Sequence, residues 1–334
     1  MSGALRTRRP ATPALRDIQA PVHDRLEEAS KELERIAVAD FPMLEDMGRY
    51  LLHMRGKMFR PTLALLSSAV DGRPEPRSRT VAATIELVHL ATLVHDDSVD
   101  HSVMRRGMPT LNALFSHQVS VIMGDFLYSR AMVELVRLGD IEMLRVLAAA
   151  TNAMTIGEMR QLTSLDALAF SEDDYESLIR AKTASLLSAA CELGALAGAA
   201  RHRQALARYG MCLGMGFQVA DDILDYVSTE VQTGKPTGAD LKEHKVTLPL
   251  IAALRSMSAA GRRDVDALFG TAEPGDDQIA RVTSIVSEEG GIEYARRRAA
   301  EYATGAEEAL DGLPDSPVLV SLHDAIAYAV ERSN

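Results

Sequence analysis

The chain has 334 residues, of which 47% are hydrophobic and 25% are charged, and its formal net charge is −11. This composition is typical of a globular protein with a sizeable core, and the negative charge argues against a general nucleic-acid surface, which needs a positive field. The two cysteines, Cys191 and Cys212, lie in apolar runs. We therefore expect reduced thiols and a cytoplasmic protein.

The first twenty residues hold several arginines and two prolines, with no apolar segment behind them. We predict a disordered tail over residues 1–20 and a single folded domain over residues 21–334. No uninterrupted apolar run is long enough to span a bilayer, so we expect no integral membrane segment.

The rest of the chain follows the periodicity of helices. Apolar residues recur at helical spacing almost throughout, whereas the alternation and turn signals of strands are missing. Pro61 and Ser171 are typical of helix starts. The expected loops cover residues 71–78, 101–109, 229–244, 270–277 and 312–317. The predicted fold class is therefore all-α.

The segment 81–100 combines apolar walls with a polar stripe. Its polar side chains are spaced so that they stay close to one helical face, and they are Glu86, His89, Asp96, Asp97 and Asp100. Burying charged groups without partners is costly, so we expect this face to border a cavity.

The segment 214–228 repeats this design. Gln218, Asp221, Asp222 and Asp225 share one face of an otherwise apolar helix, so the chain carries two Asp-Asp-X-X-Asp motifs. Either motif alone could cap or solvate a helix end. Neither has the loop spacing or the glycine of an EF-hand.

Six carboxylates around one cavity require cations. Two like charges about 4 Å apart repel by roughly 4 kcal/mol at an effective dielectric constant of about 20. Carboxylate oxygens without a nearby cysteine or histidine pair favour Mg²⁺, which usually completes its shell with water and phosphate oxygens. The sequence therefore predicts a diphosphate ligand and a Mg²⁺ site at Asp96, Asp97, Asp100, Asp221, Asp222 and Asp225.

With these motifs, the chain resembles the polyprenyl synthetase family of trans-isoprenyl diphosphate synthases. The residues DDSVD at 96–100 and DDILD at 221–225 match its two aspartate-rich motifs, and the likeness is strong over roughly residues 50–250. The resemblance implies a single-domain isoprenoid synthase helical bundle around a central active-site cavity, three Mg²⁺ ions and a homodimer. It implies catalytic roles for Asp96, Asp97, Asp100, Arg105, Lys182, Asp221 and Asp222.

The resemblance also implies contacts to two substrates, isopentenyl diphosphate and an allylic diphosphate. Residues 56–61, GKMFRP, look like the isopentenyl diphosphate element of the family, and residues 104–107, MRRG, supply one arginine for each diphosphate. The substrate-binding residues implied are Gly56, Lys57, Arg60, His89, Arg105, Arg106, Lys182, Thr183, Gln218, Lys235 and Lys245. Without the two aspartate motifs, these residues would be interpreted structurally: GKMFRP as a helix start, His89 as a core histidine, and Arg105 and Arg106 as part of a solvated loop.

The chain departs from the family pattern at three positions. Arg55 and His244 stand where the family usually has glycine, and Phe59 stands where a smaller aliphatic residue is common. None of these changes removes a charged group that the chemistry requires.

Product length should depend on the helix turns that precede Asp96, because one turn advances about 5.4 Å, close to one isoprene unit. Val88, Ala91 and Thr92 are small or moderate in size, so we expect an open floor, meaning that no side chain at these positions stops the growing prenyl chain. The sequence resembles the octaprenyl type in this respect. We therefore expect a medium to long product for a quinone side chain. A plug deeper in the tunnel would instead give a farnesyl or geranylgeranyl diphosphate synthase, and the candidates are Met123, Leu127, Met132 and Met154.

Two rivals come from other classes. A terpene cyclase shares the helical fold and the first motif but typically lacks the isopentenyl-site cations. A regulatory subunit of a heteromeric synthase commonly loses an aspartate motif. Lys57 and Arg60 argue against the first, and the presence of both motifs argues against the second.

Overall fold

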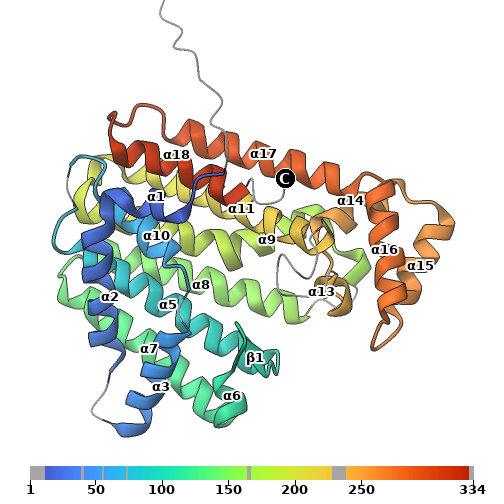
Figure 1. The fold of residues 1–334 in the computed structure, drawn as a ribbon, viewed down its shortest axis with the longest axis horizontal. Coiled ribbons are helices and arrows are strands. Elements are labelled where there is room, and N and C mark those ends of the chain that lie inside the picture. The colour runs from blue at the N-terminus through green and yellow to red at the C-terminus, as the bar shows by residue number, and fades with distance from the viewer. Residues whose placement is uncertain are drawn as a thin grey trace, which may run out of the picture.

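The structure is a computed structural model that describes residues 12–38, 41–54, 56–72, 74–163, 167–227 and 238–330. It confirms the all-α fold, since helices make up nearly all of the described part (Figure 1). The α-helices are α1 (Leu15–Gln19), α2 (His23–Ala37), α3 (Pro42–His53), α4 (Phe59–Ser68), α5 (Ser78–Val99), α6 (Leu111–Leu114), α7 (His117–Arg137), α8 (Ile141–Thr163), α9 (Glu172–Ile179), α10 (Ser185–Gly198), α11 (Arg203–Val227), α13 (Ala239–Lys242), α14 (Leu248–Ser256), α15 (Ala259–Phe269), α16 (Asp276–Glu288), α17 (Gly291–Ala309) and α18 (Pro317–Val330).

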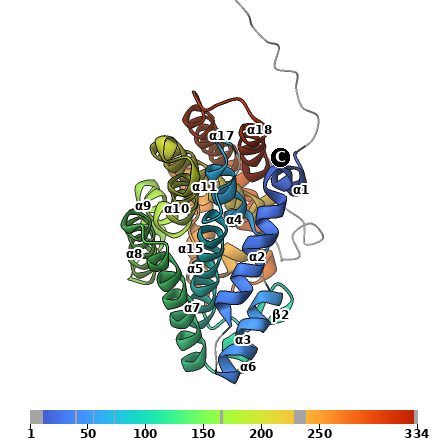
Figure 2. The same cartoon turned by 90° about the vertical axis from the view of Figure 1, so that its left-hand side faces the viewer.

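Helix α5 lies in the interior of the bundle. It packs against α2, α4, α7 and α10, which surround it in the end-on view of Figure 2. Most of its side chains are buried on all sides, as its nearly continuous apolar sequence requires. The first aspartate motif lies at its C-terminal end, so one end of a rigid core helix carries these carboxylates.

Helices α4 and α10 approach each other so closely that glycine is needed at the contact. A Cβ atom at Gly194 would lie 2.0 Å from the carbonyl oxygen of Ala64, and one at Gly198 would lie 2.2 Å from that of Ser68. Both glycines of α10 therefore let its backbone rest on the backbone of α4. This contact sets the position of α4, whose first turn carries Arg60.

A π-helical turn interrupts the path from α9 into α10. Helix α9 begins at Glu172, and Ser171, predicted as a helix start, is its N-cap; the Ser171 hydroxyl accepts from the backbone N–H of Asp174 in a capping box. Residues Arg180–Ala184 then form the π-turn η3 before α10 continues. Such turns are frequent at functional sites because the inserted residue redirects the side chains around it. This one carries Lys182 and Thr183.

Helix α11 joins two apolar cores. Its first half packs within the core built on α5, and its second half packs within a smaller core with α14, α16 and α17. The smaller core lies toward the end of the molecule that α15 and α16 occupy in Figure 1. The second aspartate motif therefore lies on the part of α11 that packs within the smaller core, beside Val219 and Ile223.

Two expectations are corrected. Residues Leu15–Gln19 form α1 with Ile18 fully buried, so the predicted tail boundary after residue 20 is too late; residues 1–11 lie outside the described part. The expected loop 101–109 contains a hairpin of two short strands, β1 (Met104–Arg105) and β2 (Met108–Pro109). Within the described residues, no helix is long and apolar enough to cross a membrane.

Candidate active site

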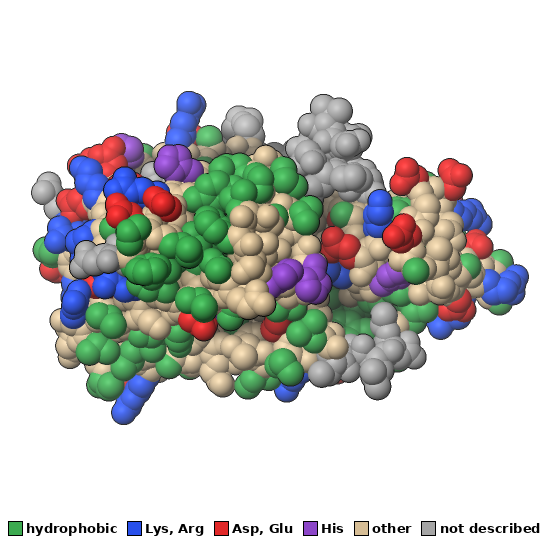
Figure 3. Space-filling model, turned by 90° about the horizontal axis from the view of Figure 1, so that it is seen from below, with side chains coloured by type: hydrophobic (Ala, Val, Ile, Leu, Met, Phe, Trp, Pro, Cys, Tyr) green, Lys and Arg blue, Asp and Glu red, His purple; other side chains and the backbone are tan. Residues whose placement is uncertain are grey.

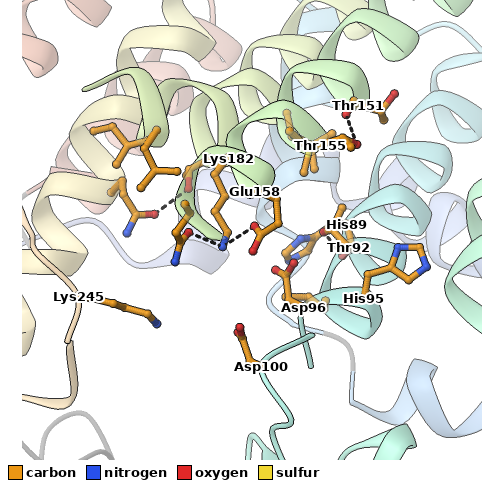
Figure 4. Close-up of a pocket in the computed structure, with 18 of the residues that line it drawn as sticks. His89, Thr92, His95, Asp96, Asp100, Thr151, Thr155, Glu158, Lys182 and Lys245 are labelled. Atoms are coloured by element: carbon orange, nitrogen blue, oxygen red, sulfur yellow. Dashed lines mark hydrogen bonds and ion pairs between the residues drawn. The ribbon is translucent and has the colours of Figure 1, made fainter. Parts of the chain in front are cut away.

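A cavity of about 1250 Å³ opens between α5, α8, the π-turn η3, α11 and the segment after α13. Charged side chains of both signs line it. The carboxylates are Asp96, Asp100, Asp125, Glu158, Asp222, Asp240 and Glu243, and the cations are Arg60, Lys182 and Lys245. Figure 4 shows Asp96, Asp100, Lys182 and Lys245 facing the same open space from different elements. The structure thus brings both predicted motifs and three predicted cations to one cavity.

The first motif presents two of its three aspartates to the cavity. Asp96 and Asp100 line the cavity one turn apart on α5. The pKa of Asp96 is raised to about 6, chiefly by burial and also by the nearby Glu158 and Asp100 carboxylates, against the opposing effect of Lys182. A cation bound beside Asp96 would stabilise the ionised form of this carboxylate.

Asp97 is directed elsewhere. It does not line the cavity, and its buried carboxylate accepts two bonds of 2.9 Å from Nε of Arg105 and lies 2.8 Å from Nη2 of the same side chain. The pair ties the end of α5 to strand β1. The structure therefore does not place Asp97 or Arg105 among the residues that face the cavity.

The second motif is divided in the same way. Asp222 lines the cavity, accepts a 2.6 Å bond from the Tyr175 hydroxyl and a 2.8 Å bond from Gln218, and is buried. Burial raises its pKa to about 8, with Asp240 and Asp221 contributing, although both hydrogen bonds oppose the shift. Asp221 is exposed and outside the cavity lining.

Asp225 positions another carboxylate. Its two oxygens accept 3.0 Å bonds from the backbone N–H groups of Ala239 and Asp240, so it caps the start of α13. Asp240 thereby reaches the cavity lining, where burial and the Asp225 charge raise its pKa to about 6. Sequence reasoning missed Asp240. No pattern in ADLKEHK distinguishes it from the polar residues beside it.

Lys182 is held by two side chains of α8 that sequence reasoning also missed. Its ammonium lies 2.7 Å from Glu158 and donates a 3.0 Å bond to Gln161 (Figure 4). On the same π-turn, Thr183 donates a 2.8 Å bond to Gln218 of α11. Glu158 and Gln161 are three residues apart, so their shared helical face was the available signal.

The residues predicted to bind isopentenyl diphosphate are divided, because Arg60 and His89 face the cavity whereas Lys57 does not. Arg60 and His89 line the cavity, and burial lowers the pKa of His89 well below its usual range, with Arg60 and Arg106 acting in the same direction. His89 is therefore neutral near pH 7 and can donate from one ring nitrogen. The exposed Lys57 lies near Tyr328, with 3.4 Å between its Nζ and the Tyr328 hydroxyl, outside the cavity lining.

Gly56 makes room for Arg106. A Cβ atom at position 56 would lie 2.9 Å from Nη2 of Arg106, whose Nη1 donates a 2.6 Å bond to the carbonyl of Met54. We expect Gly56→Ala to displace this guanidinium and to raise KM for isopentenyl diphosphate about tenfold, the effect of weakening one charged contact. Steady-state kinetics on both substrates would test this.

Gly275→Ala is the matched control for that substitution, because a Cβ atom at Gly275 meets nothing within 4 Å. An unchanged KM for isopentenyl diphosphate in a folded Gly56→Ala protein would contradict the assigned role of Gly56. An equal change in KM for the allylic substrate would show that the effect is not local to Arg106.

The described non-glycine residues with a left-handed backbone all lie in the segments of this site. They are Met58, His101, Arg106 and His244, with φ between 52° and 55°. Backbone strain of this kind persists where surrounding contacts hold it and is concentrated at functional sites. His244 adopts the conformation expected of the glycine that it replaces, and its ring contacts the carbonyl of Thr271 at 2.9 Å. The next residue, Lys245, reaches the cavity.

The residues predicted to control product length are in place. Val88, Ala91 and Thr92 all line the cavity. Of the four deeper plug candidates, Met154 lines it, whereas Met123, Leu127 and Met132 are not in the lining. Lys235 lies outside the described residues.

The donor atoms fit Mg²⁺. The cavity offers carboxylate oxygens from α5 and α11, which are hard ligands, and a bound cation would lower the raised pKa values of Asp96 and Asp222. Among the described residues, no three acidic, histidine or cysteine side chains converge closely enough to bind one ion by themselves. A Mg²⁺ ion here needs water or phosphate oxygens to complete its shell, as it commonly does.

Comparisons with known proteins agree with this geometry. The polyprenyl synthetase family model matches residues 41–286. Octaprenyl diphosphate synthase of Haemophilus influenzae is 37% identical over 300 residues, which cover 88% of this chain and 90% of that protein. The crystal structure of a decaprenyl diphosphate synthase from Rhodobacter capsulatus has a TM-score of 0.90 and 33% identity, and covers 96% of this chain and 100% of that chain.

A polyprenyl synthase from Caulobacter crescentus CB15, solved with calcium and isoprenyl diphosphate, also has a TM-score of 0.90, with 30% identity over 98% of this chain and 100% of that chain. The family model matches most of the chain, and the relatives match it over nearly their full length. Both findings assign the chain to the same family. The chain belongs to the polyprenyl synthetase family.

Proposed function

We propose that this cavity is where the chain, a trans-prenyltransferase, joins isopentenyl diphosphate to an allylic diphosphate with the help of Mg²⁺. The observation that carries the proposal is that carboxylates of α5 and α11 face one cavity together with Arg60, Lys182 and Lys245. The cavity continues into an apolar region along Val88 and Ala91. Its relatives make octaprenyl and decaprenyl diphosphates, and the chain makes medium- to long-chain all-trans polyprenyl diphosphates.

Three Mg²⁺ ions would be held at Asp96 and Asp100 on one side and at Asp222 on the other, and would supply Lewis-acid stabilisation of the departing diphosphate. The calcium and isoprenyl diphosphate bound to the Caulobacter crescentus relative support a divalent metal at such a site. Asp97 and Asp225 contribute indirectly in this scheme, because they hold Arg105 and α13.

The side chains of this chain position the two substrates. Lys182 and Thr183 bind the allylic diphosphate, while Arg60 and His89 orient isopentenyl diphosphate with its double bond toward the allylic carbon. The allylic carbon–oxygen bond breaks, the double bond attacks the resulting cation, and a proton from the new cation passes to the released diphosphate. Apolar walls at Val88 and Leu186 exclude water, which would quench the cations.

We also propose that the chain forms a homodimer through the face around α7. Exposed apolar side chains lie on α7 and in the segment from the hairpin to the loop before it, and α8 carries others. They are Val103, Met104, Leu114, Phe115, Val121, Ile122, Val133 and Val136, with Ile141, Ile156, Met159 and Leu162 on α8. Figure 3 shows a broad apolar area on the side seen from below. Apolar surface of this extent is typical of an interface. A cytoplasmic location stays a prediction, supported by the free thiols of Cys191 and Cys212.

Incorporation of labelled isopentenyl diphosphate by the purified chain alone, with farnesyl diphosphate as primer, tests the proposed function. We expect elongation with Mg²⁺ and none after chelation by EDTA. Folded protein that elongates no primer by itself, but does so when a second subunit is added, would contradict the proposal and favour a regulatory subunit. Cyclic hydrocarbon products formed without isopentenyl diphosphate would favour a terpene cyclase.

A further inference from the structure

The cavity extends between α5, α7 and α8 to a part that we call its lower end. Along α8 its lining runs from Glu158 past Thr155 and Thr151 to Ala148, and the labelled members of this row follow one another along the helix in Figure 4. Beyond Ala148, the side chains of Leu147 and Met143 are completely buried in the core. Ala148 itself is exposed, so packed core bounds the path of a growing chain on the side of Leu147 and Met143.

Tyr128 of α7 lies at this lower end. It is the largest side chain among the described residues that line the part between α5, α7 and α8, where the α5 residues Val88, Ala91 and Thr92 are small or moderate. Its ring is therefore the main bulk that a prenyl chain meets once it has passed α5.

A hydrogen bond across the cavity holds the ring of Tyr128. Its hydroxyl lies 3.3 Å from Oγ1 of Thr151 on α8. The Thr151 hydroxyl lies 3.1 Å from the carbonyl oxygen of Leu147, to which it donates, so it is left to accept from Tyr128. The pair links α7 to α8 below the reacting groups.

The depth of this link can be placed along α8. Thr151 precedes Glu158 by seven residues, which corresponds to about 10 Å along the helix axis. That distance is about two isoprene units, when one unit is taken as about one helix turn. Short prenyl chains fit above the ring, whereas longer chains have to displace it.

We propose that Tyr128, held by Thr151, is a gate that sets the product-length distribution of this enzyme. The inference rests on the proposed function and extends it to a residue on α7. A chain of about two units stops against the ring. Further growth breaks one neutral hydrogen bond and turns the half-buried ring out of the path. Product length is then controlled on α7 and α8 as well as on α5.

The test compares product sizes from wild type and three variants at limiting isopentenyl diphosphate. In Tyr128→Ala the short intermediates that accumulate in wild type disappear, and the final product lengthens by at least one isoprene unit. In Thr151→Val and Tyr128→Phe the ring stays but the hydrogen bond is lost. Their short intermediates fall about fivefold, the factor expected for one neutral hydrogen bond, and the final length is unchanged.

Phe126→Ala is the matched control, because it removes a ring from the same helix that packs against the core and lies outside the cavity lining. It leaves the product sizes of wild type. An active Tyr128→Ala enzyme with the wild-type distribution would overturn the inference, and so would the same lengthening in Phe126→Ala. If wild type itself elongates nothing, the proposed function fails instead, which keeps the two failures distinct.

Discussion

Replacing Asp96 with asparagine is expected to slow product formation by about three orders of magnitude while making the metal-free protein more stable above pH 6. The loss follows from removing a charged oxygen from the place where Mg²⁺ and the diphosphate meet, since such electrostatic stabilisation contributes several kcal/mol to catalysis. The gain in stability follows from the buried position of this carboxylate, whose pKa is raised from 3.8 to about 6.

The sign of the pH dependence is fixed by that shift. The folded state binds a proton at Asp96 more tightly than the unfolded state, so ionisation destabilises the fold progressively between pH 3.8 and about 6, and fully above that range. Asparagine removes this penalty. We expect the Asp96→Asn protein in EDTA to gain about 2 °C or more in Tm at pH 7.5, equivalent to about 1 kcal/mol, and to gain little at pH 4.

Thermal unfolding at both pH values and turnover at saturating Mg²⁺ measure the two effects. Asp46→Asn, which changes an exposed carboxylate of α3, is the control and should leave both unchanged. An equal gain in Tm at both pH values would show that the gain does not come from removing the negative charge of Asp96. If turnover of the Asp96→Asn protein stays within tenfold of wild type, Asp96 is not a ligand of the catalytic metal.

Replacing the adjacent Asp97 is expected to have the opposite effect on stability. Its carboxylate is 8% exposed and pairs with Arg105 at 2.8 Å, so Asp97→Asn leaves the guanidinium without its counter-charge. We expect a loss of about 2 kcal/mol, or about 3–4 °C in Tm for a chain of this length, for this half-buried pair. Turnover should fall about a hundredfold, because the hairpin that carries Arg105 and Arg106 is no longer held against α5.

A double-mutant cycle with Arg105→Gln isolates this interaction. If the pair acts as a unit, the second substitution adds little to the first in either Tm or turnover. Arg145→Gln, which breaks an exposed ion pair with Glu142, is the control and should change Tm by less than about 1 °C. Additive losses at Asp97 and Arg105 would show that each acts through other contacts.

The contrast between these neighbours shows what spacing along a helix can predict. The Asp96–Asp100 spacing of one turn correctly predicts that both face the cavity. Asp97 lies about 100° further around the helix axis than Asp96, and that rotation is enough to direct it to Arg105. A shared face is therefore too coarse a criterion to separate metal ligands from their supporting residues.

Tertiary contacts account for most of what could not be predicted. Glu158 and Gln161 share a face of α8, but nothing in the sequence of that helix names their partner, and only the approach of η3 gives them Lys182. Asp240 reaches the cavity because Asp225 caps α13. The first twenty residues look like a polar tail, yet Ile18 of α1 is buried, because α1 packs against α18.

The most direct test of the account is the size of the products formed by the purified chain with Mg²⁺, labelled isopentenyl diphosphate and, in separate reactions, dimethylallyl, geranyl and farnesyl diphosphates. We predict dephosphorylated products of about thirty carbons or more, which need growth well past the turns of α5 that carry Ala91 and Val88. Products that stop at about fifteen or twenty carbons with every primer, from folded and active protein, would contradict the open floor at these residues.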